Sequence, residues 1–398
     1  MRKKIVIPGW IWGVVVGCLL ALGQFERFVL PGGIGMYLHE VLLILLVIWG
    51  VAQRSVLEAV SKRMVSSSLN IKLFKAFLAF AGVGYVIHFF QTGFQFTPFL
   101  YLGRILLYFA GLFVVSVQVE KDKWSKSFLQ AAMVTFASLL VYFGWLQYFL
   151  IPDTRWLFFL GWDDHYYRFL SSMLDPNFTG ILLILFYCWV QSWKNVQLKI
   201  ILSVVLAVSV LFTYSRSSYV ALAVAMLLDI LFSIKDRKWQ HSLLVGVLIL
   251  AAVSAIPFLP RPGGEGVKLE RTSTIVGRQD RIISTLKSFN GVEWVVGKGL
   301  YVADDSTSDQ TYQVDNHGTQ ADNWVLFLLS GTGIVGIVLL GILSGEIFFH
   351  AVSVNKYWST AAVALLVHSL FVASMLFPFV LLFMGGWWVL VSSKKATR

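Results

Sequence analysis

The sequence predicts an all-α, polytopic membrane protein that crosses a bilayer about twelve times, and three observations lead to this fold class. First, 57% of its 398 residues are hydrophobic and only 13% are charged, which is about half the charged fraction of a soluble domain. Second, the charges gather in short islands between apolar stretches long enough to span a bilayer. Third, most lysines and arginines fall on one side of these stretches. We therefore expect residues 1–398 to form a single membrane domain.

The expected spans follow one another along the whole chain. They lie near residues 9–23, 34–52, 73–91, 97–119, 127–151, 177–193, 198–214, 217–234, 242–259, 322–343, 359–376 and 378–392. Because the last two flank Pro378, one broken hairpin is the alternative there. The first span follows a basic N-terminus and stays apolar beyond Cys18 without a small-residue cleavage motif. We therefore expect an uncleaved span and not a signal peptide.

The orientation follows from positive charge, which accumulates in cytoplasmic loops. Threading the spans from a cytoplasmic N-terminus leaves roughly twenty lysines and arginines inside and about twelve outside, with more than half of the latter in one long loop. Both termini are therefore expected in the cytoplasm. This distribution also explains the net charge of +11 without nucleic acid as a partner. Cys18 and Cys188 fall inside expected spans, so neither a disulfide framework nor a metal site is expected. No cofactor is expected, because the sequence has no nucleotide-binding fingerprint.

Two expected external segments are too long to be simple connectors. Residues 152–177 form the smaller loop, and residues 260–321 form the larger one, which is the main polar stretch of the sequence. Long ordered loops on a rigid scaffold usually carry function. The functional site is therefore expected at the external face.

The run Ser215-Arg216-Ser217 lies between two expected spans with almost no loop. One interpretation is a serine N-cap followed by an arginine that extends to the membrane interface. The other is a phosphate clamp, because a guanidinium binds phosphate through two parallel hydrogen bonds and a helix N-terminus adds unpaired N–H groups. The residue types alone leave both interpretations open.

Arg278 and Arg281 lie in the larger loop, where the pattern predicts a helix that opens at Gly277. Apolar side chains at positions 282, 286 and 289 would share one face of this helix. If that face lies on the membrane, Arg278, at its edge, points to the lipid headgroups, and Arg281 is turned further towards water. An amphipathic surface helix with incidental arginines is the alternative.

Asp322 and Asn323 directly precede an apolar span, and His317 lies a few residues upstream. Either Asp322 or Asn323 would serve as an N-cap. A carboxylate at the membrane mouth near a histidine is also what general-base catalysis on a sugar hydroxyl requires. Arg104 is a charged residue in the outer half of an expected span, which makes it a candidate for lining a cavity. Asp229 and Glu346 are weaker candidates, because they lie near the expected cytoplasmic ends of their spans.

Taken in order, several short runs resemble the O-antigen ligase and O-antigen polymerase superfamily of bacterial envelope enzymes. The resemblance covers roughly residues 170 to 340. Its runs are Asp175-Pro176-Asn177, Ser215-Arg216-Ser217, Gly277-Arg278, Gly297-Lys298-Gly299, and Asp322-Asn323 leading into the glycines Gly331, Gly333 and Gly336. Taken alone, the first run is typical of an ordinary helix start, and the run at 297–299 is typical of a turn. The resemblance implies a GT-C-like fold in the bacterial plasma membrane and a metal-independent, inverting glycosyl transfer.

The resemblance also implies substrates and roles. The donor would be a glycan on undecaprenyl pyrophosphate, bound by Arg216 and Arg278, and the acceptor another glycan or a lipid. Arg281, Arg104 and Asn323 are further candidates for substrate binding. Ligases carry a histidine directly before the asparagine, where this chain has Asp322. We therefore favour a polymerase of surface polysaccharide over a ligase, with Asp322 as the base and His317 as the alternate.

Two other classes of function stay open. A flippase for lipid-linked oligosaccharide should carry polar residues through the middle of several spans and have little external structure, whereas here the spans are nearly free of charge. A non-catalytic partner in an envelope complex would tolerate alanine at all the positions named above. For the enzyme, the expected partners are membrane lipids, a chain-length regulator and a flippase.

Overall fold

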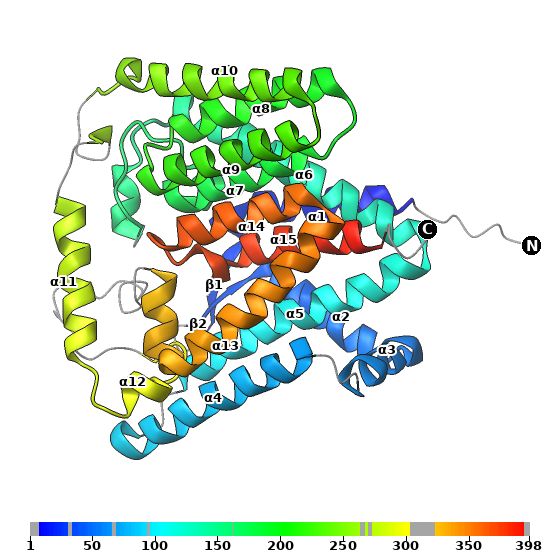
Figure 1. Ribbon diagram of the computed structural model, residues 1–398, viewed down its shortest axis with the longest axis vertical. Helices are drawn as coiled ribbons and strands as arrows, with labels where there is room; N and C mark the ends of the chain where they lie inside the picture. The colour runs from blue at the N-terminus through cyan, green and yellow to red at the C-terminus, as the bar shows by residue number, and fades with distance from the viewer. Residues whose placement is uncertain are drawn as a thin grey trace, which may run out of the picture.

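The computed structural model describes residues 8–30, 34–65, 69–93, 96–160, 162–262, 267–269, 273–302 and 323–393. Each expected span corresponds to one helix (Figure 1). In chain order these helices are α1 (Gly9–Ala21), α2 (Leu38–Val51), α4 (Leu69–Thr92), α5 (Thr97–Lys121), α6 (Lys123–Leu150), α7 (Pro176–Gln191), α8 (Val196–Leu211), α9 (Arg216–Lys235), α10 (Trp239–Ala255), α13 (Trp324–Val354), α14 (Lys356–Ser369) and α15 (Pro378–Ser392). The connections hold η1 (Gly23–Glu26), β1 (Arg27–Leu30), β2 (Ile34–Tyr37), α3 (Arg54–Val65), η2 (Arg155–Leu160), η3 (Ser171–Met173), η4 (Ile256–Phe258), α11 (Ser273–Lys287), α12 (Glu293–Val296) and η8 (Ser374–Leu376).

The composition of the helices identifies an integral membrane protein. Among the described residues, five helices are long and apolar enough to cross a bilayer: α5, α6, α9, α10 and α13. The apolar segments of α1, α2, α4, α7, α8 and α15 are shorter, with 10–17 residues each. This confirms the all-α membrane class, while the number of about twelve crossings stays a prediction.

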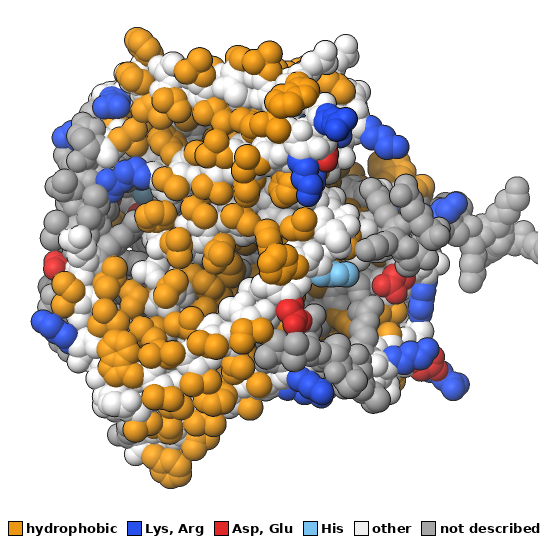
Figure 2. Space-filling view, in the orientation of Figure 1, with side chains coloured by type: hydrophobic (Ala, Val, Ile, Leu, Met, Phe, Trp, Pro, Cys, Tyr) orange, Lys and Arg blue, Asp and Glu red, His pale blue; other side chains and the backbone are white. Residues whose placement is uncertain are grey.

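The visible face of the molecule consists of an apolar band between two flanks that carry the lysines and arginines (Figure 2). The band covers α10, α9, α13 and α4 (Figures 1 and 2). We call the flank where α7, α9 and α13 begin the Arg216 flank, and the flank where α9 ends the Asp236 flank. Helix α1 begins and α15 ends on the Asp236 flank, at the right of Figure 1. An apolar band with charged margins is the surface expected of a protein embedded in lipid.

Helix α7 forms the centre of the bundle. Every residue from Thr179 to Gln191 is buried, and the helix packs against α8, α9, α14 and α15. A helix that is apolar on all sides belongs in the interior. The start of α7, which carries the Asp175-Pro176-Asn177 run, is thereby placed at the middle of the Arg216 flank.

Helix α1 packs closely along α6 through small residues. Gly9, Gly13 and Gly17 are buried on one face of α1, because residues four apart lie above one another on a helix. A Cβ added at Gly13 would lie 2.2 Å from the carbonyl oxygen of Phe128 in α6. Small residues at this spacing let two membrane helices approach backbone to backbone, so the first span is bound tightly to the core.

Four expectations about the elements are wrong in detail. Strands β1 and β2 pair antiparallel, with Arg27 opposite Tyr37, and we call this pair the hairpin. The all-α class predicted no strand, but pairing satisfies backbone groups between two helix ends. Because β2 takes the start of the expected span 34–52, α2 begins only at Leu38. Helix α14 ends at Ser369, earlier than the expected 376. Helix α11 begins at Ser273, so Arg278 lies inside the helix and not in its opening turn.

Candidate functional site

The structure places the sequence-predicted site residues that it describes on or near one flank of the bundle. Arg216 is the first residue of α9 and Asn323 is the N-cap of α13. Arg278 and Arg281 belong to α11, which runs along the Arg216 flank at the left edge of Figure 1. The side chains of these two arginines, and all of Asp322 and His317, lie outside what the structure describes.

Two of the predicted runs meet at the starts of α7 and α9. Ser215 Oγ donates a hydrogen bond to Asn177 Oδ1 at 2.7 Å. Asp175 caps α7, because its Oδ1 accepts from the backbone N–H groups of Asn177 and Phe178 at 2.6 and 2.9 Å. Ser215 caps α9 by accepting from the N–H of Ser218 at 3.3 Å. Both N-cap interpretations are therefore confirmed, and the positive ends of two helix dipoles lie side by side.

The turn that precedes Ser215 has a strained backbone. Tyr214 has a φ of 51°, which is uncommon for a residue with a side chain and costs about 1–3 kcal/mol. Arg168 is 5% exposed and donates to the carbonyls of Thr213 and Tyr214 at 2.9 and 3.4 Å. The Tyr214 hydroxyl donates to the carbonyl of Pro260, where the larger loop begins. Strained turns held by buried polar groups are frequent at functional sites.

The half-buried side chain of Arg216 points towards the larger loop. Its Nη1 donates to the carbonyl oxygen of Leu269 at 3.4 Å. Since Ser215 supplies the cap, Arg216 adds its guanidinium to the first turn of α9, where backbone N–H groups also face outwards. The cap and the clamp are thus compatible, and a guanidinium at a helix N-terminus has the chemistry to bind phosphate.

The run at residues 297–299 is docked against a break in α13. The N–H groups of its lysine and second glycine donate to the carbonyls of Ser330 and Gly331 at 2.7 and 3.1 Å. Gly333 interrupts the helix with a φ of 62°, and a Cβ there would lie 2.2 Å from the carbonyl oxygen of Val295 in α12. Glycine is required by both the left-handed backbone and the close approach. The run is therefore more than an isolated turn, because it ties the larger loop to α13.

Arg104 is paired with a buried carboxylate. Its Nε lies 2.7 Å from Glu40 Oε1, and its Nη2 donates to the carbonyl of Gly35 in the hairpin. Glu40 also accepts from the N–H of Tyr37 at 3.0 Å and from the hydroxyl of Tyr108 at 2.8 Å. The charge of Arg104 is thus largely neutralised by Glu40, and its role in lining a cavity stays a prediction.

Glu26 and His39 extend this group of charges. His39 Nδ1 lies 2.5 Å from Glu26 Oε1, and Nε2 lies 2.8 Å from the Tyr108 hydroxyl. Since Tyr108 gives its one proton to Glu40, its hydroxyl oxygen accepts from His39 Nε2 in this arrangement. We call Glu26, His39, Glu40, Arg104 and Tyr108 the hairpin cluster. In it, the carboxylates of Glu26 and Glu40 face the imidazole of His39 and the guanidinium of Arg104.

A series of aromatic rings links the hairpin cluster to the start of α13. The guanidinium of Arg104 lies 5.5 Å from the ring centroid of Tyr101. The series has neighbouring centroids 5.0, 5.0 and 5.5 Å apart and consists of Tyr101, Tyr301, Phe327 and Trp324. Asn323 stands directly before the last ring and caps α13 by accepting a backbone hydrogen bond at 2.8 Å. We call these four rings the aromatic wall, and it extends from Arg104 to Asn323.

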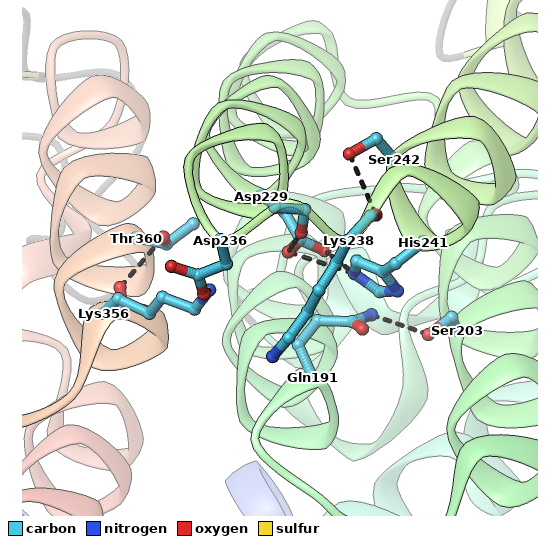
Figure 3. A network of polar contacts seen from close by, with 10 residues as sticks. Gln191, Ser203, Asp229, Asp236, Lys238, His241, Ser242, Lys356 and Thr360 are labelled. Carbon is cyan, nitrogen blue, oxygen red and sulfur yellow. Dashed lines mark hydrogen bonds and ion pairs between the residues drawn. The ribbon is translucent and has the colours of Figure 1, made fainter.

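Another polar network, part of which is buried, lies on the Asp236 flank (Figure 3). Asp229 is 1% exposed and pairs with His241 Nε2 at 3.1 Å. Asp236 pairs with Lys356 at 2.5 Å. Thirteen residues of α9 separate Asp229 from Arg216, and at 1.5 Å per residue this is about 20 Å. This network therefore joins the helix ends of the opposite flank and lies apart from the candidate site.

Four buried polar residues near the Arg216 flank were not predicted from the sequence. They are Glu26, His39, Glu40 and His368. A signal was present, because an ionisable residue within or beside an apolar span is a functional candidate by default. The roles of the two glutamates were not predicted, because they flank the short connection between α1 and α2 and their partners come from distant helices.

Comparison with known proteins gives one match. Residues 201–341, which run from α8 to the break in α13 and beyond it, match the family model described as O-antigen ligase. No curated protein and no solved structure is significantly similar to the chain. The matched segment contains the Ser215-Arg216-Ser217 run, the docked run at 297–299 and the glycines 331, 333 and 336 of α13. The match covers about a third of the chain and, together with the apolar helices, supports the resemblance to the superfamily of O-antigen ligases and O-antigen polymerases.

Proposed function

We propose that the chain polymerises oligosaccharide repeat units linked to undecaprenyl pyrophosphate into a surface polysaccharide of the O-antigen, capsule or teichuronic-acid type. The observation that carries this proposal is the hydrogen bond between Ser215 and Asn177. It brings two runs of the family together at two helix N-termini on the flank where the larger loop lies. Arg216 stands at this junction, and the family match includes it.

The donor pyrophosphate is assigned to Arg216 and Arg278. Arg216 projects from the first turn of α9 towards residue 269 of the larger loop, and α11 carries Arg278 and Arg281 along the same flank. Two positive side chains and a helix N-terminus would stabilise the charge that develops on a departing pyrophosphate. This is why the proposed reaction needs no metal ion.

The proposed chemical step is an inverting displacement. The oxygen of an acceptor hydroxyl attacks the anomeric carbon of the donor sugar, and the bond from that carbon to the pyrophosphate oxygen breaks. The bonding electrons leave with undecaprenyl pyrophosphate. The hydroxyl proton passes to a base, for which Asp322 is proposed and His317 is the alternate. Asn323 and Arg104 are proposed to contact substrate at the aromatic wall between them.

The proposed setting has about twelve spans in a GT-C-like arrangement. Both termini would be cytoplasmic, which agrees with α1 beginning and α15 ending on the same flank (Figure 1). The Arg216 flank would then be external, with residues 152–177 and 260–321 as the external loops. A flippase would supply the donor, and a chain-length regulator would act on the product.

The test is the size of lipid-linked glycans in a deletion strain that is complemented with the wild type, Asp322→Ala, Arg216→Ala or Arg278→Ala. A polymerase predicts that single repeat units accumulate on undecaprenyl carrier in the deletion strain and in each variant. Long chains stranded on the carrier would indicate a ligase instead. Repeat units confined to the cytoplasmic leaflet would indicate a flippase. Full activity of both arginine variants, with normal membrane insertion, would refute the pyrophosphate clamp.

A further inference from the structure

His368 of α14 is a buried histidine whose two ring nitrogens both have partners. It is 0% exposed. Its Nδ1 lies 2.7 Å from Ser374 Oγ in η8. Its Nε2 lies 3.2 Å from Ser217 Oγ and 3.3 Å from Ser218 Oγ, both in the first turn of α9. The ring therefore bridges the end of α14 to the residue that follows Arg216.

The partner on the Nδ1 side determines which nitrogen carries the proton. Ser374 Oγ donates to the carbonyl oxygen of Val372 at 3.1 Å. A hydroxyl has one proton, so Ser374 accepts from His368, and Nδ1 carries the hydrogen. The neutral ring then has an acceptor at Nε2, which faces the start of α9.

The serines of α9 determine which hydroxyl donates to that acceptor. Ser218 Oγ gives its proton to Ser215 Oγ at 2.9 Å, and Ser215 gives its own to Asn177 Oδ1 at 2.7 Å. Ser217 Oγ also lies 3.0 Å from Ser215 Oγ, but that oxygen already accepts from the N–H and the hydroxyl of Ser218. The proton of Ser217 is therefore left for His368 Nε2. The geometry gives a directed pair in which Ser217 donates to His368.

We infer that His368 is a positioning residue for Arg216: it accepts a hydrogen bond from Ser217 and so fixes the first turn of α9, from which the donor-binding guanidinium projects. This inference rests on the proposed function, because it assigns a purpose to the orientation of Arg216. The strained Tyr214 (φ 51°) precedes this turn, so the turn depends on such contacts to hold its geometry. Helix α14 also packs against α9, which makes His368 a fixed reference point.

Two substitutions separate positioning from simple packing. In His368→Gln, the side-chain amide reaches the place of Nε2 and can still accept from Ser217. In His368→Asn, the shorter amide reaches only the place of Nδ1, so it keeps Ser374 and loses Ser217. His350→Asn, an exposed histidine at the far end of α13, is the matched control. Each purified protein is assayed with undecaprenyl-pyrophosphate-linked repeat units, varying the donor and acceptor concentrations separately.

We expect His368→Asn to lower kcat/KM for the donor by roughly 3- to 10-fold, the loss of one buried hydrogen bond, without changing KM for the acceptor. His368→Gln should retain most of the wild-type value. If His368→Asn does not fold, Ser217→Ala serves instead and should show the same donor defect. Wild-type donor kinetics in His368→Asn or Ser217→Ala, or equal defects in the Asn and Gln variants, would overturn this inference alone. Absence of transfer by the wild-type protein would overturn the proposed function as well.

Discussion

The ion pair between Arg104 and Glu40 gives the most specific stability prediction. Arg104 Nε lies 2.7 Å from Glu40 Oε1, and the two side chains are 22% and 2% exposed. Breaking a buried pair by removing one partner costs about 3–5 kcal/mol, because the other charge is left uncompensated. Water can reach the remaining Arg104 more easily than the remaining Glu40. Arg104→Met should therefore cost towards 5 kcal/mol and Glu40→Gln about 3 kcal/mol.

The assay is equilibrium unfolding in mixed detergent micelles, followed by tryptophan fluorescence, for the wild type, both single variants and the double variant. The double variant should lose much less stability than the sum of the single variants, since it leaves no unpaired charge. The reasoning is refuted if the two losses simply add, or if Glu40→Gln is the more damaging change. Additive losses would mean that Arg104 is available to substrate without its partner.

Three further predictions concern other parts of the fold. Gly333→Ala should abolish the docking of residues 297–299 and reduce polymer formation severely, because Gly333 has a φ of 62° and no room for a Cβ. The control is Gly341→Ala, at an open position of the same helix. Equal activity of the two variants would contradict the docking role. Asp175→Ala should destabilise the protein by about 1 kcal/mol through loss of the α7 N-cap, measured by unfolding; a change indistinguishable from zero would mean that the start of α7 is capped in another way. Lys356 holds the pKa of Asp236 below its usual value through a hydrogen bond, so the stabilisation from this partly exposed pair should be present above about pH 4 and fade as the pH falls. Lys356→Met should lower the free energy of unfolding by less than about 1 kcal/mol at pH 7. A loss of stability that persists undiminished at pH 3 would show that packing is the cause.

Sequence patterns within one segment predicted much of this structure. Hydropathy depends on consecutive residues, and each expected span contains a helix. The N-caps Asp175, Ser215 and Asn323 were also predictable, because a cap acts on residues two or three positions away. The pairing of β1 with β2 was not predicted, because Ile34–Tyr37 falls at the start of the expected span 34–52.

The candidate site was predictable only in its separate parts. Arg216 was identified from its run, but its surroundings come from Asn177, His368 and the larger loop, which are distant in the sequence. Similarly, Arg104 was recognised as an unusual charge, while its partner Glu40 became apparent only when α2 packed against α5.

The sequence by itself determined the class of the protein, its helices and their caps, because these depend on composition and on contacts within a few residues. Only the tertiary structure decided which polar groups share a site. A hydrogen bond such as that of Ser217 with His368 requires two atoms about 3 Å apart, although 151 residues separate them in the chain. Such proximity follows from the packing of α14 against α9, which the pattern of neither helix specifies alone.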